Sequence, residues 1–130
     1  MLLGKILKDL WILTSTGVVL YSRVIDETID PQLFGALMSA LNTFAERLSD
    51  GGISNFELNN LRFVVLRRKY FLFIGSTANK TKEKTTLEEL KVISEKFLNV
   101  YSQDILSNWN NDISLFRDFG KYIKKSLKKA

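Results

Sequence analysis

The stretch from residue 53 to residue 78 constrains the fold of this chain more than any other. Three short runs rich in Val, Ile, Phe and Tyr follow one another here, separated by Asn59-Asn60 and by Arg67-Arg68-Lys69. β-Branched and aromatic residues favour strands, and Asn tolerates the positive φ of tight hairpin turns. The pattern predicts a three-stranded antiparallel meander. Its second and third runs are apolar at nearly every position, so we expect other parts of the chain to cover both faces of the sheet.

A second pair of strands is predicted near the N-terminus. Residues 10–14 and 18–25 are apolar runs on either side of Ser15-Thr16-Gly17, a spacing typical of a β-hairpin. Neither run alternates cleanly between apolar and polar residues, which favours a hairpin in the middle of the sheet and not at a solvent-exposed edge. Residues 1–9 form an N-terminal extension, either a short helix or a continuation of the first strand.

Residues 31–48 are predicted to form the first helix. Asp30 can cap it, and Pro31 suits the first helical position because it removes no hydrogen bond that the helix needs. Asp50-Gly51-Gly52 ends it. We interpret its apolar stripe as core packed on one face of the sheet, in preference to a free docking surface. The stripe consists of Leu33, Phe34, Leu37, Met38, Leu41, Phe44, Ala45 and Leu48.

Two more helices are predicted after the meander. Thr86 and Glu89 have the spacing of a capping box for the second helix, and Asp112 can cap the third. The apolar face of the second helix comprises Leu87, Leu90, Ile93, Ser94, Phe97, Leu98, Tyr101 and Ile105, and that of the third Ile113, Phe116, Phe119, Ile123 and Leu127. The predicted fold is a single α+β domain spanning residues 1–130, in the order β-β-α-β-β-β-α-α. One helix would cover one face of a five-stranded antiparallel sheet and two helices the other.

Several function classes are disfavoured by composition. The chain has neither Cys nor His, which excludes disulfides, thiolate or imidazole metal sites and imidazole catalysis. It lacks a phosphate-binding loop of the Gly-x-x-x-x-Gly-Lys type, and the acidic cluster of Asp26, Glu27 and Asp30 suits a helix N-terminus better than a cation. No apolar run approaches the roughly 20 residues of a membrane span. We therefore expect a soluble, cytoplasmic, non-enzymatic protein with no catalytic residue, metal or cofactor.

The net charge of +5 is concentrated in the basic tail, residues 121–130. Its five lysines account for the whole excess, because the other 14 basic residues balance the 14 acidic ones. A nucleic-acid-binding face is therefore not expected. Arg67-Arg68-Lys69 is interpreted mainly as a charged hairpin end that keeps the sheet from aggregating, and otherwise as a contact for an anionic partner. The tail is either a solvated terminus or a weak membrane contact on anionic lipid, through Lys121, Lys124, Lys125, Lys128 and Lys129.

The order of elements resembles that of the longin domain, a profilin-like α-β-α sandwich. The likeness covers roughly residues 10–123 and is strongest in residues 10–17 and 56–70, where a Val-Val strand flanked by basic residues leads into an aromatic one. The hairpin before the first helix disfavours a roadblock domain. The resemblance implies an interaction module in vesicle trafficking or small-GTPase regulation, acting as a dimer or as a subunit of a larger complex. It implies as partner a Ras-superfamily small GTPase, or another longin or roadblock chain, with peripheral placement at a membrane as one option.

The strand order of a longin would place residues 18–25 and 53–60 at opposite edges of the sheet. The first of these strands lacks charge before Arg23, so its edge is a template for pairing with another chain. We predict that self-association or GTPase docking uses the neighbouring face of the first helix and Val18, Val19, Leu20, Tyr21 and Arg23. The alternative function is a small-molecule sensor with its ligand between sheet and helix, which a core crowded with phenylalanines disfavours.

Overall fold

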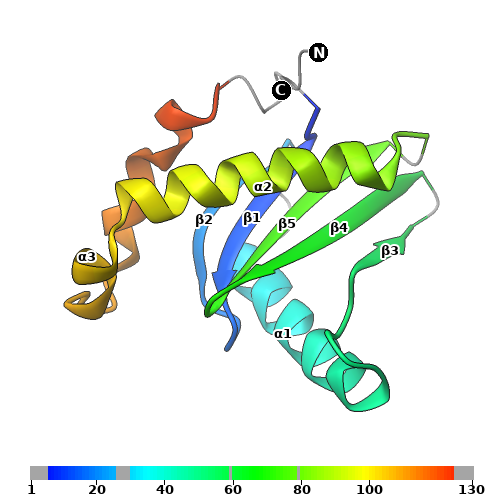
Figure 1. The fold of residues 1–130 in the computed structure, drawn as a ribbon, viewed down its shortest axis with the longest axis horizontal. Coiled ribbons are helices and arrows are strands. Elements are labelled where there is room, and N and C mark those ends of the chain that lie inside the picture. Colours follow the sequence, from blue (N-terminus) through cyan, green and yellow to red (C-terminus); the bar gives the residue numbers. More distant parts are fainter. Residues whose placement is uncertain (1–5, 26–29, 59, 79, 125–130) are drawn as a thin grey trace.

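The structure is a computed structural model, which describes residues 6–25, 30–58, 60–78 and 80–124 (Figure 1). Five strands form one antiparallel sheet in the spatial order β2-β1-β5-β4-β3. The strands are β1 (Asp9–Thr14), β2 (Val19–Arg23), β3 (Asn55–Glu57), β4 (Leu61–Arg68) and β5 (Phe71–Ala78). The helical segments are α1 (Pro31–Leu48), α2 (Glu83–Val100), α3 (Gln103–Ser107) and the 3-10 helix η1 (Ile113–Tyr122). The predicted fold class and both predicted edge strands are confirmed.

Both faces of the sheet pack against a core, which explains why so few strand positions are polar. β5 lies at the centre and pairs with β1 on one side and β4 on the other, so that Ile74 is opposite both Trp11 and Val65. Successive residues of a strand point to opposite faces. Leu10 and Ile12 therefore enter the core on one face of β1, whereas Trp11 and Leu13 enter the core on the other.

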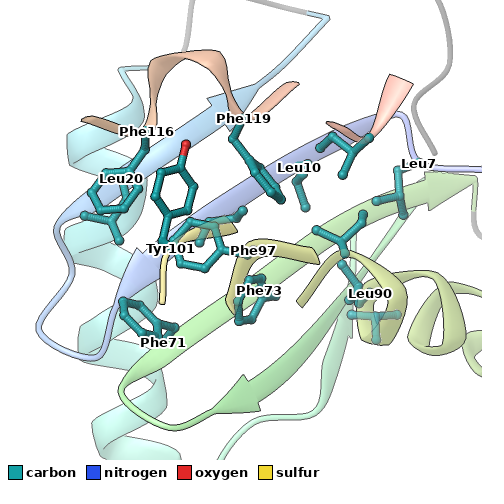
Figure 2. Close-up of a cluster of buried hydrophobic side chains, with 14 residues drawn as sticks. Leu7, Leu10, Leu20, Phe71, Phe73, Leu90, Phe97, Tyr101, Phe116 and Phe119 are labelled. Carbon is teal, nitrogen blue, oxygen red and sulfur yellow. The ribbon is translucent and has the colours of Figure 1, made fainter. Parts of the chain in front are cut away.

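α2 and η1 cover one face of the sheet, and α1 crosses the opposite face (Figures 1 and 2). The core on the α2 side is centred on Phe97, whose ring contacts Phe73 at 5.7 Å, Phe116 at 5.5 Å and Phe119 at 5.3 Å between centroids. All four side chains are fully buried. Burying aromatic side chains of this size contributes several kcal/mol, so this layer is a main source of stability.

The start of α2 differs from the prediction. The helix begins at Glu83, and its capping residue Lys82 makes no side-chain hydrogen bond to the helix. Thr86 and Glu89, predicted as a capping box, lie inside the helix and are buried. The capping-box spacing is short and recurs by chance, and here it marks two buried positions inside the helix and not its start. α2 ends at Val100, so that Ile105 belongs to the separate helix α3.

The last helical segment follows the prediction in its cap and its buried face. The Asp112 carboxylate accepts a hydrogen bond from the Ser114 amide at 3.0 Å, and this bond holds the pKa of Asp112 below its ordinary value. Phe116, Phe119 and Ile123 are buried as expected. The segment is a 3-10 helix, and Ile113 at its start is 41% exposed. Leu127 lies outside the described residues.

Candidate partner-binding surface

The most unusual surface of the molecule is the outer side of α1. Five large apolar side chains point into solvent there, with exposed fractions from 38% to 73%. Their spacing places them within about a quarter of the helix circumference, given 3.6 residues per turn. We call this set the α1 apolar face; it consists of Leu33, Leu37, Leu41, Phe44 and Leu48.

This arrangement corrects the prediction that the whole stripe of α1 is core. The residues of α1 that are buried are Gly35, Met38 and Asn42, with Phe34 half-buried beside them. A Cβ atom on Gly35 would lie 2.4 Å from the Gly17 carbonyl oxygen, so α1 meets the β1–β2 turn backbone to backbone. Helical periodicity shows which residues share a face, but not which face a neighbouring element covers. Because α1 contacts the β1–β2 turn through its Gly35 side, the α1 apolar face is left exposed to solvent.

The two sides of α1 are held in place by specific contacts. Phe34 stacks on Trp11 of β1 with ring centroids 4.1 Å apart, and the aromatic row continues through Phe63 to Phe56 of β3. On the opposite flank, the Ser39 hydroxyl donates to the Ser15 carbonyl at 3.0 Å. Because this flank faces the β1–β2 turn, the α1 apolar face lies on the side away from that turn.

α1 also lacks the charges of an ordinary surface helix. Its only charged residues are Glu46 and Arg47, both near its C-terminal end. Ala36 and Ala40 are exposed beside the α1 apolar face and add no polar group. Soluble monomers rarely expose a contiguous apolar patch of this kind, and such patches usually mark interaction sites.

β2 is an edge strand, as the longin strand order predicted, so the mid-sheet position that its apolar run favoured is wrong for this strand. Its side chains are also placed differently from the prediction. Val19 and Leu20 are buried, and within the run of Val18 to Tyr21 only Val18 counts as exposed, at 42%. The Gln32 side-chain amide accepts from the Val19 amide and donates to the Val19 carbonyl, both at 3.0 Å. The first part of the free edge is therefore already hydrogen-bonded to α1. Strand pairing along β2 stays a prediction.

The remaining predicted residues of β2 are turned toward the C-terminal segment and the N-terminus. Tyr21 packs edge-to-face on Phe119 at 5.6 Å. Burial raises the pKa of the Tyr21 hydroxyl, and the nearby Arg23 partly offsets this effect. Arg23 itself donates to the Lys8 carbonyl at 3.4 Å. These contacts make Tyr21 and Arg23 part of the packing between β2 and its neighbours.

The predicted membrane contact is described in part. Lys121 and Lys124 are exposed, and the Lys121 ammonium lies 5.4 Å from the Tyr122 ring centroid. Ile123, which lies between these two lysines in the sequence, is buried in the α2-side core and does not face solvent with them. Lys125, Lys128 and Lys129 lie outside the described residues. Membrane contact stays a prediction, which liposome binding with and without residues 121–130 would test.

The acidic cluster before α1 is also described in part. Asp26 and Glu27 lie outside the described residues, whereas Asp30 caps α1 as predicted, accepting from the Gln32 amide at 2.9 Å. Among the residues that the structure describes, no group of acidic side chains is arranged to hold a metal ion. No helix in the same part of the chain is both long and apolar enough to cross a membrane.

A five-stranded antiparallel sheet in the order β2-β1-β5-β4-β3, with α1 on one face and α2 on the other, defines the longin class of α-β-α sandwich. The family can be named more closely. Residues 8–128 match the family model described as the first longin domain of FUZ, MON1 and HPS1, and the chain belongs to this family. No curated protein matches the chain in a sequence search.

Solved structures of related shape include a roadblock/LC7 domain from Streptomyces avermitilis. It has 15% sequence identity and a TM-score of 0.54, over 73% of this chain and 88% of that chain. The gliding protein MglB from Thermus thermophilus has 10% identity and a TM-score of 0.50, over 65% of this chain and 72% of that chain. At these identities the likeness concerns the fold alone. Longin and roadblock domains share this sheet, and the family match places the chain among the longins.

Proposed function

We propose that this longin domain is a non-enzymatic interaction module that binds a second longin-type chain through the α1 apolar face. One observation carries the proposal: five large apolar side chains lie exposed along a helix with two charged residues. An 18-residue helix is about 27 Å long, enough to form the centre of an interface of ordinary size. The side chains offered are hydrophobic anchors and not groups that transfer protons or act as nucleophiles.

The choice of partner follows from the shape of the helix surface. Large side chains at Leu33, Leu37 and Leu41 run beside the small, exposed Ala36 and Ala40. When two such helices pack antiparallel, the large residues of one helix fit over the small residues of the other. The surface is therefore self-complementary. The partner that fits it is the α1 helix of a second copy or of another longin chain.

The finer role is proposed from the family. The longin resemblance links such modules to vesicle trafficking and small-GTPase regulation, and membership of the family supports that setting. We propose that the paired longin domains form the unit that a Ras-superfamily GTPase binds. β2, with Val18, Tyr21 and Arg23, is the second surface to test for that contact. Trp11, Phe34 and Phe63 pack ring against ring between α1 and the sheet, which disfavours the sensor alternative.

The test uses two leucines of matched exposure. Leu41 on α1 is 38% exposed and Leu115 on η1 is 42% exposed. Leu41→Glu and Leu115→Glu therefore place a carboxylate at positions of similar exposure, one inside the proposed interface and one outside it. Sedimentation equilibrium of the purified chain should show a dimer for the parent and for Leu115→Glu. Leu41→Glu should dimerise at least about tenfold more weakly, as expected for a central interface residue. A parent that remains monomeric at all concentrations would exclude a second copy as partner, and unchanged dimerisation of Leu41→Glu would exclude α1.

A further inference from the structure

Arg67 is half-buried on one face of the sheet, whereas the next residue, Arg68, is exposed. It lies on the same face of β4 as Phe63 and Val65, the face that α1 crosses. Its guanidinium donates through Nη1 to the Gly51 carbonyl, and through Nη2 to the Ile53 carbonyl at 3.4 Å. Both acceptors belong to the loop between α1 and β3. Arg67 thus also binds the loop after α1, and its predicted role in a charged hairpin end stays a prediction.

α1, the loop and β4 meet around this guanidinium. Gly51 and Gly52 have φ values of 88° and 72°, which turn the chain sharply after α1. A Cβ atom on Gly52 would lie 2.7 Å from Arg67 Nη2 and 2.6 Å from Oδ1 of Asn42, one of the few buried residues of α1. The loop thus fits closely between the arginine on one side and the helix on the other.

The C-terminal half of α1 has few other attachments. In its last two turns Leu41, Phe44 and Leu48 point into solvent, and Asn42 is the one residue that is buried. The strand that follows the loop, β3, contains three residues. A helix end with so little apolar packing is expected to fray unless polar contacts hold it. Arg67 supplies contacts of this kind from the end of β4.

We infer that Arg67 is a positioning residue for the partner surface. By binding the loop after α1, it holds Leu41, Phe44 and Leu48 in line with Leu33 and Leu37. The α1 apolar face is then a single surface before a partner arrives, which reduces the ordering cost of binding. This inference rests on the proposed function, because it assumes that the α1 apolar face is the interface.

The experiment compares three variants of the full chain. Arg67→Met removes the donors but keeps an unbranched chain, Arg67→Lys keeps the charge without the planar pair of donors, and Arg68→Met changes the exposed neighbour as a control. Hydrogen exchange is measured at a dilution where each chain is monomeric. Arg67→Met should speed exchange in residues 44–54 by at least about tenfold while α2 amides exchange as in the parent. Arg68→Met should leave both regions unchanged.

Sedimentation equilibrium of the same variants supplies the second readout. Arg67→Met should weaken dimerisation by at least about tenfold, with Arg67→Lys between it and the parent, because loss of preorganisation raises the cost of binding. Arg67→Lys also serves if Arg67→Met does not fold. Unchanged exchange in residues 44–54, or faster exchange with unchanged dimerisation, would overturn the positioning role while leaving the proposed function standing. If Leu41→Glu has no effect on dimerisation, the proposed function fails and the positioning role fails with it.

Discussion

α1 and α2 are both 18 residues long and lie on opposite faces of the same sheet, yet they use their apolar residues in opposite ways. α2 buries Leu90, Ile93 and Phe97 completely and carries seven charged residues, of which only Glu89 is buried. α1 carries two charged residues and leaves five large apolar side chains in solvent. α2 thus has the composition of a helix that packs within its own chain. α1 has the composition of a helix with a second partner.

The two helices show that an apolar stripe does not by itself identify a buried helix face. In α2 the buried apolar residues Leu90, Ile93 and Phe97 lie on one side, which packs against the sheet and η1. In α1 they extend from the buried side around Met38 to the exposed side around Leu37. A helix that is apolar over more than one side is either buried in a core or placed in an interface. The low number of charges, and not the stripe itself, separates the two cases.

The largest expected difference concerns two phenylalanines at comparable places on the two helices. Phe97→Ala should lower the free energy of unfolding by about 3–5 kcal/mol, because Phe97 is fully buried at the centre of an aromatic cluster. Phe44→Ala should change it by no more than about 0.5 kcal/mol, because Phe44 is 63% exposed. Urea denaturation of dilute, monomeric protein measures both. Similar losses for the two variants would show that Phe44 is covered within the monomer.

A smaller effect is expected at the close contact that orients α1. Gly35→Ala should destabilise the protein by about 1–3 kcal/mol, because the added methyl would clash with the Gly17 carbonyl and Val19. The exposed control Ala36→Ser should stay within about 0.5 kcal/mol. Without the clash, Gly35→Ala would instead stabilise the helix by up to about 1 kcal/mol through its higher helix propensity. The sign of the change in urea midpoint therefore decides whether α1 lies as described.

The smallest effect concerns the helix starts. Asp30→Ala should cost about 1 kcal/mol, since the Asp30 carboxylate accepts from the Gln32 amide at the start of α1. Lys82→Ala should cost nothing measurable, because the Lys82 side chain makes no capping bond at the start of α2. Thermal unfolding of both variants beside the parent tests the contrast. An unchanged Asp30→Ala midpoint would mean that the first turn of α1 contributes little to the folded state.

Much of the architecture was predictable from local patterns. The apolar runs of β1, β4 and β5 predicted covered strands because strand residues alternate between two faces, and both faces here are buried. Asp30-Pro31 predicted the start of α1 and Asp112 the start of η1, because each cap is formed by residues only two positions apart. The capping box at Thr86 and Glu89 was predicted on equally local grounds and was wrong.

Local sequence patterns were enough to predict the five strands, the order of strands and main helices, and which residues lie on the same side of each helix. Local patterns did not show which side of α1 meets the sheet. They also did not show that the Gln32 side chain hydrogen-bonds the backbone of Val19 at the β2 edge, or that Arg67 donates to the loop after α1. The difference lies in how far apart in the sequence the interacting residues are. Caps and periodicity involve residues a few positions apart, whereas the contact of Gly35 with Gly17 and of Arg67 with Gly51 joins segments that are separated in the sequence and meet only when the sheet has formed.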